Sequence, residues 1–240
     1  MVQIENRLET TKTIEKDYLA GYQENEKKAA RKRHRSYVGG MWEQMGAFQS
    51  DFLKQHGLRP QHTFLDVGCG SLRAGRVLVD YLSPGNYYGI DIDPGIIGAG
   101  YDHELTEEQR ARLPVENLHA TDRFDCSFGQ VRFDTAIAQS VFSHISLNLM
   151  RLCMYRVAQV MKPGGSFFVT FFEREPEAPI DHFGTSTGSQ VTTYTERDPY
   201  WYYSSDLEWM ITGMPWEYHY IGDWGHPRGQ RMARFVRTTG

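Results

Sequence analysis

Two acidic residues flank a glycine pair at a spacing suited to binding a nucleotide-like ligand. Asp66 ends an apolar run, and Gly68 and Gly70 follow it almost directly. A second apolar run farther along the chain ends in Asp91. Glycine permits a positive φ and lets a ligand approach the backbone closely. The order acid, Gly-x-Gly, helix, strand, acid therefore predicts a nucleotide-type site with a carboxylate beside its glycine loop.

The charge around this loop favours S-adenosylmethionine over a dinucleotide as the cofactor. A dinucleotide site holds a pyrophosphate at the start of its helix and usually has a third glycine, where Arg73 stands here. Asp66 would repel a pyrophosphate, whereas it would attract the ammonium and sulfonium groups of S-adenosylmethionine. Asp91 is placed to accept hydrogen bonds from both ribose hydroxyls. The alternative is a plain turn between strand and helix, capped by Ser71.

His144 and His226 are the main candidates for a general base, and His182, which follows Asp181, is a third. Methyl transfer from a sulfonium is an in-line displacement, and a hydroxyl or amine acceptor must also lose a proton. His144 follows a predicted strand at the end where ligands bind in open α/β sheets. His226 lies in the polar cluster Asp223–Gln230, together with Arg228, whose planar guanidinium suits an anionic acceptor group. The alternatives are a histidine that packs or hydrogen-bonds beneath the cofactor and a structural turn.

The segment 173–203 is rich in proline and polar residues and shows no regular period. A loop of this length in a compact domain is usually a lid or a binding loop, so we expect an acceptor-site lid, with disorder as the alternative. An aromatic cluster ends the segment and would stack on a flat acceptor or a sugar, or else pack in the core. Ser204 or Ser205 is expected to cap the following helix. The predicted substrate-binding residues are His182, Tyr202 and Arg228.

The rest of the chain alternates between strand and helix patterns, which predicts a parallel sheet with right-handed crossovers. The predicted strands are Thr63–Val67, Tyr87–Asp91, Glu116–Ala120, Asp134–Ala138, Ser166–Phe172, Trp216–Gly222 and Arg231–Arg237. The predicted helices are Leu72–Leu82, Pro94–His103, Thr106–Arg112, Leu147–Met161 and Ser205–Thr212.

Residues 1–57 are predicted to form a helical extension and cofactor cover ahead of a catalytic domain at 58–240. An irregular apolar stripe over 1–35 predicts a helix that packs on the body or on a second subunit, giving a homodimer. Its basic end, Lys27–Arg35, is either a solvated helix face or a contact for an anionic partner. A second helix is expected over Met41–His56, with Trp42 and Phe48 more suited to the core than to ligand contact.

Composition excludes several classes of function. The chain has 240 residues and a net charge of −4, which argues against a dedicated nucleic-acid binder. Its three cysteines form no CxxC pair, so neither a disulfide framework nor a metal site is expected, and a reduced cytoplasm fits best. We find no signal-peptide pattern and no apolar run approaching the roughly 20 residues of a membrane span.

The motifs resemble those of the class I S-adenosylmethionine-dependent methyltransferases. The resemblance implies a Rossmann-like αβα sandwich with a mostly parallel seven-stranded sheet and an antiparallel last strand, here with the N-terminal helical extension. It also implies S-adenosylhomocysteine as the product. The segments that carry it are HTFLDVGCGSLRAGR (His62–Arg76), YYGIDIDP (Tyr87–Pro94), FDTAIAQSVFSHI (Phe133–Ile145) and VMKPGGSFFVTFF (Val160–Phe172).

The resemblance extends the set of cofactor-binding residues. It implies that Asp122 reads the adenine and that Gln139 contacts the methionyl amino group. Arg73 is expected to pair with the methionyl carboxylate, with an acidic acceptor or with Asp66. The family's loop commonly has a third glycine where Leu72 stands, so helix entry is expected to differ. The predicted cofactor-binding residues are Asp66, Gly68, Gly70, Arg73, Asp91, Ile92, Asp122 and Gln139.

A narrower resemblance concerns the acceptor. Tyr37–Leu53 and Tyr220–Met232 are similar to bacterial methyltransferases of glycan and secondary-metabolite pathways. The tetrapeptide after the fourth strand is AQSV rather than NPPY-like, which argues against adenine or glutamine N-methylation. We therefore expect O-methylation of a small-molecule or saccharide hydroxyl. The alternatives are a non-catalytic S-adenosylmethionine-binding subunit and a nicotinamide oxidoreductase.

Overall fold

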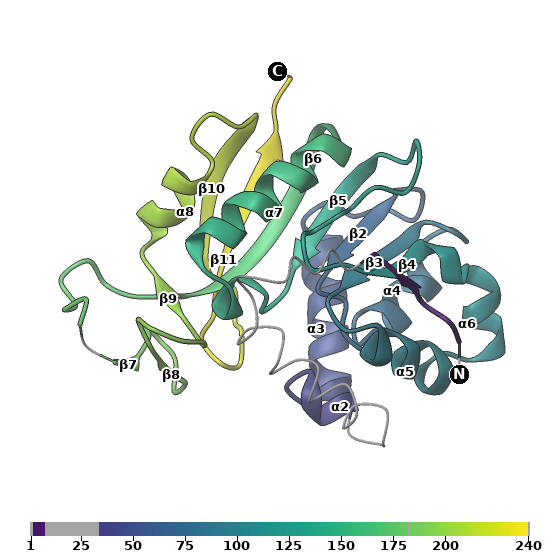
Figure 1. Cartoon of the computed structure of the whole chain (residues 1–240), viewed down its shortest axis with the longest axis horizontal. Coiled ribbons are helices and arrows are strands. Elements are labelled where there is room, and N and C mark those ends of the chain that lie inside the picture. Colours follow the sequence, from purple (N-terminus) through teal and green to yellow (C-terminus); the bar gives the residue numbers. More distant parts are fainter. Residues whose placement is uncertain (1, 8–33, 182, 240) are drawn as a thin grey trace. The chain divides into compact units, whose positions relative to one another are not determined.

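The computed structural model describes residues 2–7, 34–181 and 183–239 (Figure 1). The chain divides into two compact units, Met1–Gln130 and Val131–Gly240. We call them the first and the second unit and describe each by itself. Each one combines β-strands with α-helices, as the alternating sequence pattern predicts.

The strands of the first unit are all parallel. They are β1 (Glu5–Asn6), β2 (Phe64–Val67), β3 (Tyr87–Asp91) and β4 (Leu118–Ala120), in the spatial order β1-β4-β3-β2. All four residues of β2 are buried. Parallel strands covered on both faces are mostly apolar, as Phe64, Leu65 and Val67 of β2 are.

The helices of the first unit are α2 (His34–Tyr37), α3 (Trp42–Gln55), α4 (Gly75–Tyr81), α5 (Pro94–Glu104) and α6 (Glu107–Arg112), with a 3-10 turn, η2 (Val115–Asn117). The start of α5 follows from local sequence. Asp93 is the N-cap and its carboxylate accepts the backbone N–H groups of Gly95 and Ile96, while Pro94 occupies the first turn.

The second unit contains the antiparallel strand that the resemblance implies. β5 (Phe133–Ala138) pairs in parallel with β6 (Met161–Glu173). β11 (Arg231–Arg237) runs antiparallel to both β6 and β10 (Trp216–Asp223). Three short strands complete this unit: β7 (Gly184–Thr185), β8 (Thr192–Thr193) and β9 (Trp201–Tyr202). β7 pairs with β8, and β9 pairs with the end of β6.

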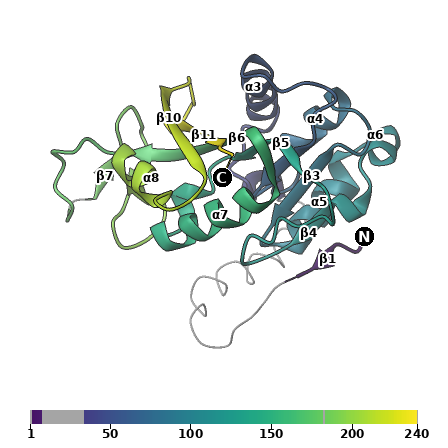
Figure 2. The same cartoon turned by 90° about the horizontal axis from the view of Figure 1, so that it is seen from above.

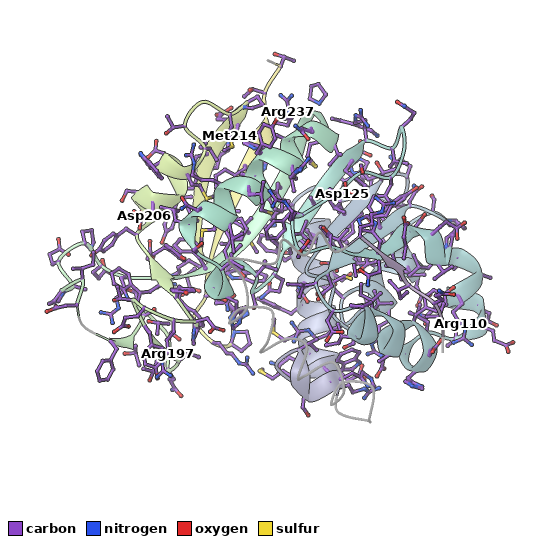
Figure 3. All side chains as sticks on the ribbon, viewed as in Figure 1. Arg110, Asp125, Arg197, Asp206, Met214 and Arg237 are labelled. Atoms are coloured by element: carbon purple, nitrogen blue, oxygen red, sulfur yellow. The ribbon has the colours of Figure 1, made fainter. Side chains whose placement is uncertain are left out.

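Two α-helices of the second unit, α7 (Leu147–Val160) and α8 (Ser204–Met210), pack against each other (Figures 1 and 2). The indole N–H of Trp216 donates to the carbonyl of Met154 at 3.1 Å. Arg237, labelled in Figure 3, donates through Nε to the carbonyl of Ala158 at 2.9 Å. These bonds fasten α7 to the β10–β11 hairpin.

Two local predictions are wrong at helix starts. The helix predicted from Leu72 begins at Gly75, because Leu72 itself has a φ of +62°. Neither Ser204 nor Ser205 is the cap of α8. The cap is Tyr203, whose backbone N–H donates to the carboxylate of Asp206 at 2.9 Å.

The N-terminal helix prediction also needs correction. Residues 5–6 form β1, and the backbone N–H of Arg7 donates to the carbonyl of Ala120, so the chain is extended here. Ile4 is buried against Gly98 of α5, which removes its apolar surface from water. The rest of the predicted helix, with its proposed dimer contact and most of its basic end, lies outside the described residues.

Candidate functional site

The glycine loop lies between β2 and α4 and has the conformation that its sequence predicts. Gly68 and Gly70 have φ values of +77° and +53°. The backbone N–H groups of Gly68 and Cys69 both donate to the carbonyl of Ile90, at 2.8 and 2.9 Å. A Cβ added to Gly70 would lie 2.7 Å from a methyl group of Val38. This loop is therefore held against the end of β3 and has no room for a side chain at Gly70.

Asp91 connects this loop to the end of β3. One carboxylate oxygen accepts the N–H of Gly70 at 2.9 Å, and the other accepts the N–H of Asp93 at 3.1 Å. Burial raises the pKa of Asp91, and these backbone hydrogen bonds oppose the rise. Each oxygen has a second lone pair, so the carboxylate can also accept ribose hydroxyls. Ile92 follows directly and is half-buried.

Asp66 is a buried carboxylate whose ionised form is disfavoured. The hydroxyl of Tyr87 donates a hydrogen bond to it at 2.7 Å. Burial and the negative charge of Asp91 raise its pKa to about 6, against the opposing effects of Tyr87 and Arg73. A cationic group beside Asp66 would stabilise the carboxylate form. A buried carboxylate of this kind suits a cationic ligand group, and its contact with S-adenosylmethionine stays a prediction.

Arg73 lies one turn beyond the glycine loop. Its guanidinium donates through Nη1 to the carbonyls of Val38 and Gly40, at 2.8 and 3.1 Å. Arg73 therefore ties the segment between α2 and α3 to the glycine loop. Asp66 is one of the partners expected for Arg73, and the positive charge of Arg73 lowers the pKa of Asp66. Its pairing with the methionyl carboxylate stays a prediction.

Asp122 is buried in the loop that follows β4. The hydroxyl of Thr121 accepts the N–H groups of Arg123 and Asp125, at 3.2 and 3.1 Å, and so closes a compact turn around it. The N–H of Thr121 donates to the carbonyl of Asp91 at 2.8 Å. Asp91 thus ends β3 and Asp122 follows the neighbouring strand β4, where the expected ribose and adenine contacts would be made.

A buried polar network joins the ends of β5, β6 and β11 in the second unit. The side-chain oxygen of Gln230 accepts from Thr170 at 2.6 Å and from Ser140 at 3.0 Å. The backbone N–H of Ser140 donates to Thr170 at 2.7 Å. Gln139 contacts both Ser140 and His226. The structure thus brings Gln139 and His226 together, although they are 87 residues apart in the chain.

The hydrogen bonds of His226 determine which nitrogen carries its proton. The backbone N–H groups of Arg228 and Gln230 point at Nδ1, at 3.1 and 3.4 Å. Nδ1 is therefore an acceptor, and the neutral ring carries its proton on Nε2. The amide nitrogen of Gln139 lies 3.0 Å from Nε2 and also donates to the hydroxyl of Ser140 at 3.1 Å. The contacts at Nδ1 favour His226 as a hydrogen-bond donor, and its role as a base stays a prediction.

His144 has the opposite arrangement. It ends a 3-10 turn, η3 (Phe142–His144), and its Nδ1 lies 2.8 Å from a carboxylate oxygen of Asp198. A carboxylate can only accept, so Nδ1 carries the proton and Nε2 has a lone pair. The hydrogen bond lowers the pKa of Asp198, with burial opposing. No local sequence pattern could reveal this pair, because 54 residues separate its members.

The structure describes two of the three predicted substrate-binding residues. Tyr202 is buried, and its hydroxyl donates to the carbonyl of Ile145 at 2.6 Å. Arg228 lies exposed in the β10–β11 connection, where its carbonyl accepts from the hydroxyl of Ser189 at 2.6 Å. His182 lies outside the described residues. The role of each in binding an acceptor stays a prediction.

An exposed aromatic cluster lies in the predicted lid. Phe183 is 63% exposed, and its ring stacks on that of Tyr194 with a centroid distance of 6.1 Å. The guanidinium of Arg197, labelled in Figure 3, lies 4.1 Å from the centre of the same tyrosine ring. Cation–π and stacking contacts of this kind hold flat groups together and leave aromatic surface exposed.

Two further observations concern what the described residues lack. Within residues 2–7, 34–181 and 183–239, no group of three or more histidine, cysteine, aspartate or glutamate side chains could hold a metal ion. In the same part of the chain, no helix is long and apolar enough to cross a membrane.

Comparison with known proteins finds similarity to methyltransferases. Residues 65–167 match a family model described as a methyltransferase domain. The magnesium protoporphyrin IX methyltransferase of Synechocystis PCC 6803, solved with bound S-adenosylmethionine, superposes with a TM-score of 0.61 at 14% identity, covering 95% of this chain and 100% of that one.

Two further solved structures are similar. The S-adenosylmethionine-bound amino pentose methyltransferase CalS10 of Micromonospora echinaspora gives a TM-score of 0.57 at 19% identity, covering 92% of this chain and 96% of that one. The CcbJ methyltransferase of Streptomyces caelestis gives 0.58 at 14% identity, covering 88% and 98%.

The fold is thus the mixed α/β, Rossmann-like fold of class I methyltransferases. The family match covers the glycine loop, both acidic strand ends and the start of β6. Residues 65–167 thus match a methyltransferase domain, and solved structures that share the fold have S-adenosylmethionine or S-adenosylhomocysteine bound.

Proposed function

We propose that this protein is an S-adenosylmethionine-dependent methyltransferase that transfers a methyl group to a hydroxyl of a small-molecule or saccharide acceptor, with His144 as the general base. The hydrogen bond between His144 and Asp198 is the observation that carries the proposal, because it leaves Nε2 able to take a proton. The predicted bases thus differ in one respect: His226 accepts through Nδ1, whereas His144 donates through it.

S-adenosylmethionine supplies an electrophilic methyl group: the acceptor oxygen bonds to its carbon while the electrons of the C–S bond return to sulfur, leaving S-adenosylhomocysteine. His144 takes the acceptor's hydroxyl proton at Nε2, which removes the positive charge that would otherwise develop on oxygen. Asp66 and Asp91 hold the cationic and ribose ends of the donor, which aligns the methyl carbon for in-line attack. Gly68 and Gly70 let the backbone approach the donor closely.

The similar structures support a small acceptor. Those described above include a magnesium protoporphyrin IX methyltransferase and an amino pentose methyltransferase involved in calicheamicin biosynthesis. Within the proposal, residues 58–240 form the catalytic domain and 173–203 act as the acceptor lid. The exposed aromatic cluster of Phe183 and Tyr194 would give this lid a flat surface for a sugar or an aromatic ring.

Transfer of a labelled methyl group into cell extract tests this function. The extract would be separated into glycan and lipid, small-metabolite, protein and nucleic-acid fractions after incubation with labelled S-adenosylmethionine. We expect label in the small-metabolite or glycan fraction, alkali-stable as an ether, with loss of label in Asp91→Ala and in His144→Gln.

The variants Asp91→Ala and His144→Gln separate donor binding from methyl transfer. Asp91→Ala should weaken donor binding measured by calorimetry, whereas His144→Gln should bind the donor normally and transfer slowly. Label confined to protein or nucleic acid would contradict the proposed acceptor class. Donor binding without transfer to any fraction would favour a non-catalytic binding subunit.

A further inference from the structure

We infer that Asp198 is a positioning residue that holds His144 in its base-competent tautomer. This inference rests on the proposed function of His144. Asp198 lies in the 173–203 segment, and its carboxylate oxygen is 2.8 Å from Nδ1 of the histidine. The sequence alone places Asp198 only beside a group of aromatic residues.

Hydrogen bonds to the backbone carbonyls on both sides of His144 hold it beside Asp198. The N–H of Tyr200 donates to the carbonyl of Ser143 at 2.7 Å. The hydroxyl of Tyr202 donates to the carbonyl of Ile145 at 2.6 Å. The residues immediately before and after His144 are thus bonded to the chain that carries Asp198. This explains why a buried tyrosine, Tyr202, lies at the end of an otherwise irregular segment.

The chemical consequence concerns the proton of the imidazole. An isolated neutral histidine can carry its proton on either nitrogen. The Asp198 carboxylate accepts the N–H at Nδ1 and thereby directs the lone pair of Nε2 outward. When Nε2 takes the acceptor proton, the same carboxylate stabilises the imidazolium, as the aspartate of a catalytic triad does.

The exposure of the His144 and Asp198 side chains favours a positioning role for Asp198 over a role in stabilising the fold. The side chains of His144 and Asp198 are 41% and 55% exposed. Ion pairs at such exposure contribute little to folding stability, because water screens them. A contact that holds an orientation without adding much stability is the arrangement expected of a positioning residue.

Nitrogen chemical shifts give the first test. In protein labelled with ¹⁵N-histidine, they report which ring nitrogen of His144 carries the proton. We expect the proton on Nδ1 in the wild-type protein. In Asp198→Ala the proton should move mainly to Nε2, and in Asp198→Glu it should return to Nδ1. An unchanged tautomer in Asp198→Ala would overturn the inference.

The methyl-transfer assay gives the second test. Asp198→Asn should lower transfer at saturating donor by roughly tenfold or more, toward the level of His144→Gln, with unchanged affinity for S-adenosylmethionine. Glu196→Gln, which removes an exposed carboxylate from the same segment, should leave transfer unchanged. Full activity in Asp198→Asn would overturn the inference, as would an equal loss in Glu196→Gln.

These measurements also separate failure of the inference from failure of the proposed function. A wild-type protein that transfers no methyl group contradicts the function, and the nitrogen shifts then decide the role of Asp198 by themselves. Active wild-type protein with an indifferent Asp198 contradicts the inference alone.

Discussion

Substituting Asp66 with asparagine should make the protein more stable and a poorer binder of its cofactor. The buried carboxylate has a pKa of about 6 instead of 3.8, so the folded state holds its proton more tightly than the unfolded state does. The contribution of Asp66 to the stability of the wild type therefore falls as the pH rises from about 4 to about 6. Asparagine keeps an oxygen for the hydroxyl of Tyr87 and carries no charge.

The magnitude follows from the difference between the two pKa values. At 1.36 kcal/mol for each pH unit, the difference between 6 and 3.8 corresponds to about 3 kcal/mol. Asp66→Asn should thus raise the free energy of unfolding by up to about 3 kcal/mol at pH 8 and by much less near pH 4. Loss of the carboxylate should weaken binding of S-adenosylmethionine tenfold or more, about 1.4 kcal/mol.

Urea unfolding at pH 8 and at pH 4, with calorimetric titration of the donor at pH 8, would check both effects. Asp51→Asn removes an exposed carboxylate from α3 and should change neither quantity. A variant at Asp66 that is less stable than the wild type at pH 8, or equally stabilised at both pH values, would refute the reasoning. So would unchanged donor affinity.

Three further predictions follow from the same site. In Tyr87→Phe, loss of the hydroxyl that donates to Asp66 should raise the pKa of this carboxyl further. Wild-type donor affinity should fall as the pH drops through about 6, and the fall should begin at higher pH in the variant; identical profiles by titration calorimetry would contradict this. Gly70→Ala should lose about 1 kcal/mol or more of unfolding free energy and bind the donor weakly, because its Cβ would meet Val38 at a φ of +53°. Val38→Ala should restore part of both losses in the double variant, and additive effects would count against the contact. Leu72→Gly should relieve about 1 kcal/mol of backbone strain at a φ of +62° but remove a fully buried side chain worth about 2–5 kcal/mol, so chemical denaturation should show a net loss.

Much of the fold was predictable because it depends on local patterns. The bounds of β3 and β11 agree with the apolar runs Tyr87–Asp91 and Arg231–Arg237. The start of α5 agrees with its Asp-Pro signal. Sterics and capping act over a few residues, so they can be read from composition and spacing. The leucine at position 72 indicated that helix entry would differ there, but the start of α4 at Gly75 was not predicted from the local pattern.

The candidate site also has a part that local sequence determines and a part that it does not. By itself, the sequence determined the acids at the strand ends and the glycines between them, since a strand, a tight turn and a helix follow from adjacent residue types. Only the tertiary structure decided which groups these residues meet. It showed that Arg73 donates to carbonyls 33 and 35 residues away, that His226 accepts backbone N–H groups and that His144 donates to Asp198. Partners so distant in the chain are chosen by the packing of strands and loops, and no local pattern encodes that packing.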